Sequence, residues 1–356
     1  MTAFLVILVI ILFGVAVWQI NKVFQLSQPD QLDQSEDSEV ASDKDNNIQG
    51  YMMLGFVLFI YGILAYCFWK WGDVLLPVSA SEHGVEIDQL MLITMVLIFV
   101  VGIFTQWLLH YFAFVYRGNK EKKALFYAEN HRLEFIWTII PVIVLAALII
   151  YGLFTWSDIM SFDEDEDTIV IELYAYQFDW RARYSGADNT LGEANVRLIE
   201  GLNQLGVDVS DPNAQDDKVV NELHLPIGKK VLFKMRSQDV LHSAFMPHFR
   251  AQMNCVPGMI TQFSFTPRIT TEDMRLEEDV IAKVQHINEI RTTKNIELIS
   301  IGEEALEMYD FDFLLLCNKI CGSNHFNMQM KIVVETEDQF NSWIDEQATI
   351  AETLKK

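Results

Sequence analysis

The stretch Leu316-Cys-Asn-Lys-Ile-Cys-Gly-Ser-Asn-His-Phe-Asn-Met328 brings two thiols, an imidazole and a thioether into one short segment. These donors follow the spacing C-x3-C-x3-H-x2-M, through Cys317, Cys321, His325 and Met328. Zinc sites use Cys, His and carboxylate, whereas copper sites for electron transfer use Cys and His with a weak Met ligand. Two cysteines four residues apart on a tight loop can bridge a pair of copper ions, so the spacing predicts a binuclear copper site.

A second histidine ligand has to come from another part of the chain, and His242 in Asp239-Val-Leu-His-Ser243 is the candidate. The cysteine stretch resembles the CuA loop of cytochrome c oxidase subunit II. The run Asp239-Val-Leu-His-Ser-Ala-Phe-Met-Pro247, with Met253 and Val256-Pro-Gly258 after it, resembles the first-histidine segment of that family. Both segments occur in the order and separation of the family. A reduced cysteine pair in a core beside an unrelated histidine would not produce this two-part pattern.

Hydrophobic residues make up 51% of the 356 residues, although the formal net charge is −23. Apolar and acidic residues are segregated along the chain, which resolves this contradiction. Each long apolar run is about the length needed to cross a hydrocarbon core of ~30 Å. We therefore expect four transmembrane helices, over residues 3–20, 52–70, 89–116 and 136–156. The acidic C-terminal part has no comparable run and is expected to form a water-soluble domain.

The distribution of Lys and Arg in short loops predicts the orientation of the spans. Segment 117–135 carries Arg117, Lys120, Lys122, Lys123 and Arg132, whereas segment 71–88 has no Lys or Arg. The basic loop is expected in the cytoplasm, so the third span runs inward and the fourth outward. This places the C-terminal domain on the periplasmic or external face of the inner (plasma) membrane, in a multi-pass protein.

The first apolar run could instead be a signal peptide, but it lacks a basic n-region and a clear small-x-small cleavage site. If this run were removed, three spans would remain and the soluble domain would lie on the cytoplasmic side. This conflicts with the orientation that the basic loop predicts, so we favour a retained span. The third and fourth runs match the helical hairpin that is usual in the family. The first two runs are then an N-terminal extension, and acidic segment 29–46 is expected to be a flexible linker.

These observations predict an ordered series of domains. Residues 1–51 are an N-terminal span with its acidic linker, and residues 52–88 are an extra span with an external loop. Residues 89–160 are a helical hairpin. Residues 161–345 are a CuA domain with an insertion at about 267–311, and residues 346–356 are a tail.

The soluble domain contains short segments rich in β-branched and aromatic residues, most of them bounded by Gly, Pro, Asn or Asp. They are Thr168–Ala175, Val231–Ser237, Gln262–Thr266, Asp312–Leu316 and Met330–Glu335. Such strands favour an all-β sandwich. The resemblance implies the cupredoxin version, a Greek-key sandwich whose ligands lie on loops at one end.

The resemblance also implies how the ligands are shared between the two coppers. Cys317 and Cys321 would bridge both ions, with His242 and Met328 completing one copper. His325 and the main-chain carbonyl of Lys319 would complete the other. The nearby His248 and Cys255 match no family ligand and are interpreted as structural.

Four positions carry or break the resemblance. Glutamate usually occupies the position of Lys319 and binds magnesium, which a lysine side chain cannot do, so magnesium binding through this residue is not expected. In Tyr174-Ala-Tyr-Gln-Phe-Asp-Trp180, Phe178 replaces a tryptophan associated with electron input from cytochrome c, and Trp180 matches a later tryptophan. Glu134 in Glu134-Phe-Ile-Trp-Thr-Ile-Ile-Pro141 resembles a family glutamate at the mouth of a proton pathway; alternatively it is a carboxylate favoured by a helix's first turn.

About 45 residues separate Thr266 from Asp312, where the family usually has a short connection. This insertion contains a charged, helix-like portion over Thr271–Gln285. It is either a surface decoration or a segment that packs against a donor protein or another membrane subunit. The acidic soluble domain suits a basic donor such as a c-type cytochrome.

The resemblance implies an electron-transfer subunit of a haem–copper terminal oxidase. It would accept electrons from cytochrome c or a haem c domain and pass them to haem in subunit I. That partner subunit would hold the haem and a further copper, and would reduce oxygen to water coupled to proton translocation. Membrane lipid and other oxidase subunits are expected partners, and membership of a supercomplex stays open.

Three alternatives differ in their chemistry. A nitric oxide reductase shares the CuA module, a membrane copper chaperone binds metal without electron transfer, and a quinol oxidase subunit II keeps the fold but loses the ligands. A chain with this negative charge is a poor nucleic-acid binder. Two of the four cysteines are assigned to copper, so no structural disulfide is expected from Cys67 and Cys255.

Overall fold

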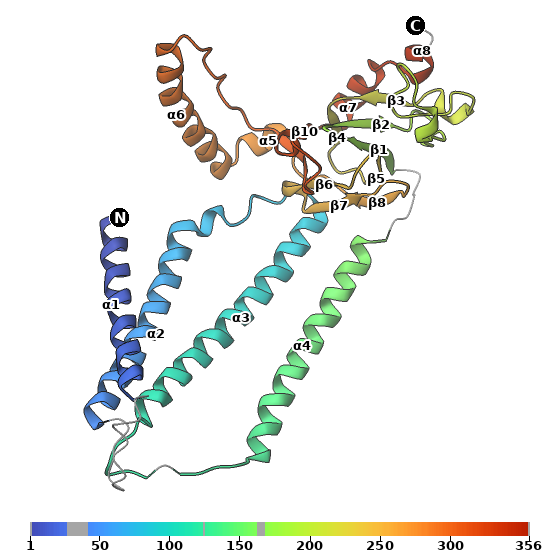
Figure 1. Cartoon of the computed structure of the whole chain (residues 1–356). Coiled ribbons are helices and arrows are strands. Elements are labelled where there is room, and N and C mark those ends of the chain that lie inside the picture. Colours follow the sequence, from blue (N-terminus) through green and yellow to red (C-terminus); the bar gives the residue numbers. More distant parts are fainter. Residues whose placement is uncertain (1, 27–41, 124, 162–167, 355–356) are drawn as a thin grey trace. The chain divides into compact units, whose positions relative to one another are not determined.

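A computed structural model describes residues 2–26, 42–123, 125–161 and 168–354 (Figure 1). Two compact units make up the chain. The first comprises residues 1–69 and 99–130, and the second comprises residues 70–98 and 131–356. The first unit is helical, and the second contains the β-sandwich.

Four long helices form in the N-terminal half: α1 (Thr2–Leu26), α2 (Asp43–Trp71), α3 (Glu82–Val115) and α4 (His131–Ile159). A helix satisfies every backbone polar group within its own segment, as lipid requires. Among the described residues, α2, α3 and α4 are long and apolar enough to cross a membrane. α1 contains the shorter apolar stretch Val9–Asn21. Three spans are therefore established by length and composition, and the fourth stays a prediction.

Polar contacts join the helices of the first unit. The side-chain amides of Gln19 in α1 and Gln49 in α2 exchange two hydrogen bonds. The Arg117 guanidinium donates to Asn47 in α2 and lies over the ring of Phe114. Because α2 begins at Asp43, the last residues of the predicted flexible linker are helical instead. Residues 27–41 of that linker lie outside the described residues.

The soluble part is a sandwich of two five-stranded sheets, which confirms the predicted all-β domain. One sheet has the order β3-β2-β1-β5-β8, with strands β1 (Ile169–Tyr176), β2 (Asp179–Tyr184), β3 (Lys218–Val220), β5 (Val231–Ser237) and β8 (Thr261–Phe265). The other has the order β4-β10-β9-β6-β7, with strands β4 (Leu223–Pro226), β6 (His242–Met246), β7 (Ala251–Cys255), β9 (Phe313–Cys317) and β10 (Gln329–Glu335).

The five predicted strands correspond to β1, β5, β8, β9 and β10 within two residues at each end. β1 pairs with β2 in antiparallel register and with β5 in parallel register. Apolar side chains from both sheets, including Leu173, Phe233, Phe313 and Ile332, are fully buried in one core cluster. Burying this apolar surface is the dominant stabilising contribution to the sandwich and holds its loops in place.

The long connection between β2 and β3, residues 185–217, covers the outer side of the β3-β2-β1-β5-β8 sheet. It includes the short 3-10 turns Val196–Leu198 and Pro212–Ala214. The buried Arg183 guanidinium, which is paired with Glu172 of β1, holds this connection by donating to the Gly192 carbonyl at 2.9 Å and to Asp217 at 2.8 Å. Burial raises the pKa of Asp217 to about 6, and the charge of Arg183 opposes that rise. The connection is therefore part of the folded domain.

The C-terminal end forms α7 (Glu337–Asp345), which starts with a capping box between Thr336 and Gln339, and α8 (Ile350–Leu354). Ile350 is buried in a cluster with Tyr174 and Leu205. The part of segment 346–356 that the structure describes thus packs on the sandwich, whereas the sequence predicted a tail.

The insertion forms two helices, α5 (Thr271–Arg275) and α6 (Glu278–Ser300). The predicted helix-like portion covers α5 and only the first part of α6. The helical prediction is therefore correct in type but too short.

Candidate metal centre

Strand pairing brings the two predicted ligand segments together. β6 and β9 are antiparallel neighbours, with Ala244 opposite Cys317. His242 is the first residue of β6 and Cys317 is the last residue of β9, so the two lie at the same end of the sheet. The backbone N–H of Asn318 donates to the Ser243 carbonyl at 3.0 Å, which ties the start of the cysteine loop to β6.

The donor atoms of the predicted ligands converge within van der Waals reach. The Sγ atoms of Cys317 and Cys321 are 3.9 Å apart, and His242 Nδ1 lies 3.8 Å from Cys317 Sγ. His325 Nδ1 lies 3.6 Å and Met328 Sδ 3.8 Å from Cys321 Sγ. The Lys319 carbonyl oxygen lies 3.2 Å from Cys317 Sγ. All six predicted donors therefore surround the same thiol pair.

These donors have the chemistry that copper needs. The donor atoms of His242, Cys317 and Cys321 all lie within 4.8 Å of one another and form a potential metal-binding group. Burial raises the pKa of the Cys321 thiol to about 11, and the adjacent Cys317 adds to this rise. A bound cation would reverse this effect, because metal binding releases the thiol protons. Two thiolates, two imidazoles and a thioether fit soft copper better than a hard cation.

The Asp239 carboxylate orients the His242 ring through the ring nitrogen that points away from the cysteines. The His242 ring is fully buried, and its Nε2 lies 2.8 Å from Asp239 Oδ1 while its Nδ1 faces Cys317. Burial alone would raise the pKa of Asp239, but hydrogen bonds from His242 and from the backbone N–H groups of Gln177 and Val240 keep it below its ordinary value. A carboxylate in this position fixes the tautomer and ring angle of a metal-binding histidine.

Gln177 connects the two ligand segments. Its backbone N–H donates to Asp239 Oδ2 at 2.7 Å, and its side-chain amide donates to the Cys321 carbonyl. Gly322 has a φ of +145°, and a Cβ there would lie 2.8 Å from the Phe178 ring. The turn after β1 and the cysteine loop are thus packed directly against each other.

Two aromatic residues predicted for electron input lie close to the site. Phe178 is half-buried and packs over Gly322. Trp180 is fully buried, with its ring centroid 6.3 Å from that of His242. Of the two, only Phe178 is exposed to an approaching donor.

The remaining candidate residues lie elsewhere or play other parts. Glu134 is in the first turn of α4, with its side chain 46% exposed and 3.5 Å from His131 Nδ1. The Lys319 residue is exposed. Cys255 faces His242 across the β6–β7 pair and is fully buried, and burial raises its pKa to about 12. His248 packs edge-on against Phe311 and Phe313.

Sequence reasoning missed Asp239 and Gln177 as supporting residues. The spacing D-x-x-H was a usable signal for Asp239, since a carboxylate three residues before a metal-binding histidine can reach its outer nitrogen. No sequence signal pointed to Gln177, because its role depends on a contact with the distant Cys321.

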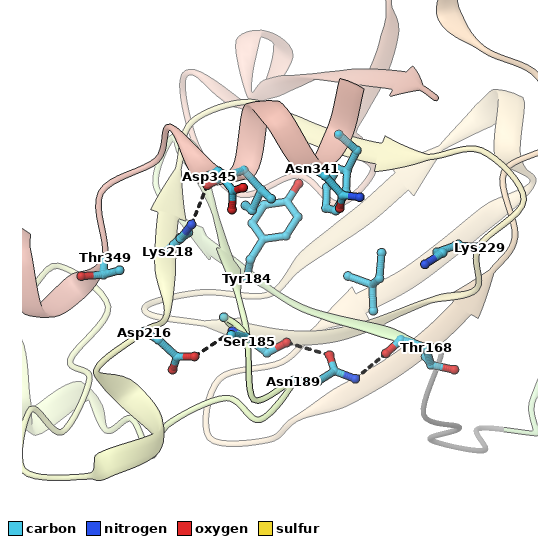
Figure 2. A pocket seen from close by; sticks show the side chains of 15 residues that line it. Thr168, Tyr184, Ser185, Asn189, Asp216, Lys218, Lys229, Asn341, Asp345 and Thr349 are labelled. Atoms are coloured by element: carbon cyan, nitrogen blue, oxygen red, sulfur yellow. Dashed lines mark hydrogen bonds between the residues drawn. The ribbon is translucent and has the colours of Figure 1, made fainter. Parts of the chain in front are cut away.

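An open pocket of about 490 Å³ lies apart from the donor set and is lined by residues such as Tyr184, Asn189 and Lys218 (Figure 2). Several of its polar groups already bind other parts of the domain. Lys218 Nζ donates to the Ile344 carbonyl, and Asn189 binds the Thr168 carbonyl and Ser185. None of its lining residues belongs to the thiol cluster, so the chemistry lies at the thiol pair.

Comparison with known proteins agrees with this geometry. Residues 69–154 match the family model for the transmembrane domain of cytochrome c oxidase subunit II, and residues 170–272 match that for its periplasmic domain. The chain is 31% identical over 243 residues to the alternative cytochrome c oxidase subunit 2 of Bradyrhizobium diazoefficiens, covering 68% of this chain and 73% of the relative. The chain belongs to the cytochrome c oxidase subunit II family.

More distant members match as well. The cytochrome c oxidase subunit 2 of Cereibacter sphaeroides is 22% identical over 286 residues, covering 75% of this chain and 78% of that protein. The crystal structure of the periplasmic domain of subunit II of cytochrome oxidase from Bradyrhizobium japonicum covers 52% of this chain and 94% of that domain, at 19% identity and a TM-score of 0.29. As a subunit II, this chain is an electron-transport component of a haem–copper oxidase complex, and the matches do not favour a nitric oxide reductase.

Membership of the family settles several coarser expectations. The chain is a membrane protein with a periplasmic domain, and the periplasmic family model implies a CuA copper centre. It acts together with other oxidase subunits.

Proposed function

We propose that this subunit II holds two copper ions at the thiol pair of its periplasmic domain. Its ligands would be His242, Cys317, the Lys319 carbonyl, Cys321, His325 and Met328. The observation that carries this proposal is the convergence of all six donors around two sulfurs that lie 3.9 Å apart. Cys317 and Cys321 would bridge the two ions, His242 and Met328 would complete one, and His325 with Lys319 would complete the other.

When bound, the copper pair supplies a one-electron redox couple. The role of the protein is to keep the donors still, so that little rearrangement follows a change of charge. β6 and β9 fix two donors through sheet hydrogen bonds, and Asp239 fixes the ring of His242. Gln177 joins the two ligand segments through Asp239 and the Cys321 carbonyl.

Electrons would arrive from cytochrome c or a haem c domain. The large excess of acidic residues in the chain favours a basic donor, whose approach electrostatic attraction would accelerate. Phe178 is a half-buried aromatic residue packed over Gly322 of the cysteine loop and would be the contact for electron input, while Trp180 is fully buried. The electron would then pass to haem in subunit I, where oxygen would be reduced to water and protons translocated.

Glu134 would lie at the mouth of a proton pathway into that neighbouring subunit. It stands in the first turn of α4, after a loop that carries Arg117, Lys120 and Lys122. The positive-inside rule places this loop in the cytoplasm. A half-exposed carboxylate at the end of a span can exchange protons with water at low cost.

In the membrane we propose four spans, with the N-terminus and the copper domain both on the periplasmic side. α3 and α4 would form the family's hairpin, and α1 and α2 would be an extension. The N-terminal span and its linker would occupy residues 1–51, the extra span with its external loop 52–88, and the hairpin 89–160. The copper domain would occupy residues 161–345, with its insertion at about 267–311, and the C-terminal segment would be 346–356.

Rapid mixing of the purified, oxidised complex with reduced cytochrome c tests the electron-transfer role. We expect the copper absorption to bleach before the haem of subunit I is reduced, and the rate to fall as salt rises. Haem reduction that precedes any copper bleaching would contradict the proposal. Oxygen consumption in the same preparation checks the terminal reaction.

A further inference from the structure

The insertion forms an arm, defined as residues 277–310, whose base belongs to the sandwich. Val280 is buried in the core cluster and Val284 packs against it. At the same base, Arg275 donates to the Phe311 carbonyl at 2.8 Å and to Asp312 at 3.0 Å. Beyond Val284, α6 contacts the return segment, residues 301–310, through hydrogen bonds from Asn288, Arg291 and Asn295.

Side chains of α6 hold the return segment in a fixed conformation. Asn288 exchanges two hydrogen bonds with the backbone of Tyr309, and Asn295 does the same with Leu306. Between them, Arg291 donates to the Glu307 carbonyl and lies over the Tyr309 ring. These three residues lie on one face of the helix. The arm is therefore a preorganised unit, which lowers the entropic cost of binding.

The outer part of the arm exposes large apolar side chains. Ile296, Ile299 and Ile301 are 68%, 64% and 69% exposed, and Leu306 and Met308 of the return segment are 40% and 59% exposed. We call these five residues the tip patch. The hydrogen bonds between Asn295 and Leu306 place the return segment beside this part of α6, so the five side chains lie at the same end of the arm. An exposed group of large apolar side chains indicates an interaction surface.

The negative charge of the arm indicates which kind of partner could bind it. The arm carries nine acidic residues and three basic ones, and Glu303, Glu304 and Glu307 flank the tip patch in sequence. Anionic lipid headgroups would repel such a surface. A second copy of the arm would place like charges together. A protein surface with an apolar groove and a rim of Lys and Arg side chains is complementary.

The base of the arm lies at the end of the sandwich where α3 begins. Phe311 and Phe313 pack on His248, and the His248 carbonyl accepts a hydrogen bond from Ala80 at 2.7 Å, two residues before α3. Cys317 is at the opposite end of β9, about 13 Å away at the rise of a strand. The arm thus starts beside a membrane helix and away from the end at which a soluble donor would deliver electrons.

We propose that the tip patch docks on the external face of another membrane-spanning subunit of the same oxidase, in an apolar groove rimmed by basic side chains. This proposal does not depend on which residues bind copper. It assigns the insertion to assembly of the complex.

Two sets of variants in the full complex test the docking. The first is the triple variant Ile296→Ser, Ile299→Ser, Ile301→Ser, which leaves Asn288, Arg291 and Asn295 intact. Its matched control is Val196→Ser, Leu202→Ser, Val209→Ser, which removes three comparably exposed apolar side chains from the connection over the first sheet. After gentle solubilisation, we expect the tip variant to retain one membrane subunit about tenfold less than the control, as the loss of buried anchors requires. The copper signal of both variants should stay unchanged.

A photo-crosslinking side chain at position 299 then identifies the occupant, with position 202 as the control. We expect a crosslink from position 299 to the membrane subunit that the tip variant loses. Charge reversal by Glu303→Lys, Glu304→Lys and Glu307→Lys should release the same subunit at low salt. Retention of every subunit by the tip variant would overturn the proposal. So would a crosslink only to lipid, to a second copy of this chain, to a soluble donor or to nothing.

Discussion

Asp239 Oδ1 lies 2.8 Å from Nε2 of His242, on the side of the ring opposite the thiol cluster. The carboxylate also accepts hydrogen bonds from the backbone N–H groups of Gln177 and Val240. These bonds fix the carboxylate, and the carboxylate in turn fixes the imidazole. The orientation of the His242 ring is therefore fixed by three residues that supply no ligand atom themselves.

Asp239→Asn keeps the size of this side chain but removes its charge. We expect copper affinity to fall by about 10- to 100-fold, because the imidazole loses the partner that sets its tautomer and raises its basicity. Copper content after dialysis against a graded chelator measures this. Glu346→Gln, an exposed carboxylate of the same domain, is the control, and equal copper retention by both variants would refute the positioning role.

Gln177→Ala should loosen the cysteine loop without removing a ligand. The substitution deletes the side-chain bond to the Cys321 carbonyl and leaves the backbone bond to Asp239. We expect copper to remain bound, with broadened hyperfine lines in the electron paramagnetic resonance (EPR) spectrum and slower electron transfer. Gln215→Ala, which removes a bond to the Val209 carbonyl far along the chain, is the control. An unaltered spectrum for Gln177→Ala would show that this bond does not hold the loop.

Lys319 separates the roles of backbone and side chain at one position. If only its carbonyl binds copper, Lys319→Ala should leave copper content and spectrum unchanged. Lys319→Glu should in addition create a carboxylate for a hard cation. Manganese, used as a magnetic substitute for magnesium, should bind to the glutamate variant of the purified complex and not to the alanine variant. Copper loss in the alanine variant would contradict this assignment.

His248 gives the periplasmic domain a defined pH dependence. Burial, together with the charges of Lys283 and Arg250, lowers the pKa of His248 to about 4. The native state therefore binds fewer protons than the unfolded state between pH about 6.5 and about 4. The free energy of unfolding is therefore unaffected by this group above pH about 6.5. It falls by on the order of 3 kcal/mol as the pH drops through the window to about 4.

His248→Gln keeps a neutral polar side chain and removes this titration. Its thermal midpoint should fall less than that of the wild type between pH 6.5 and pH 4, when both are measured in the full complex. His286→Gln, a change at an exposed position on the arm, should behave like the wild type. A parallel pH dependence in all three proteins would rule out the contribution of His248.

The sequence was sufficient to predict that the six donors converge, because all six residues lie in two short segments. Five of them offer side chains at fixed spacing, and Lys319 offers its backbone carbonyl. It also predicted β1 and β5, in which apolar, β-branched and aromatic residues outnumber the charged ones. β2 was missed because Arg181 and Arg183 interrupt its apolar pattern. The structure explains Arg183, which is buried against Glu172 of the neighbouring strand β1 and against Asp217, 34 residues further along the chain.

The length of α6 and the packing of the C-terminal end could not be predicted from the sequence either. Asn288 and Asn295 are unremarkable residues in a helix, and only the return segment gives them partners. Ile350 is an isolated apolar residue, and its burial depends on Tyr174 and Leu205. Local patterns do not encode contacts of this kind.

Copper quantification combined with EPR spectroscopy tests the central claim most directly, on the purified complex and on its Cys317→Ser and Cys321→Ser variants. A binuclear centre predicts two copper ions per subunit II beyond the copper of subunit I, with one unpaired electron delocalised equally over both. Each serine variant should lose this signal. A single copper with the spectrum of a mononuclear site, or a delocalised signal that survives either substitution, would contradict the account.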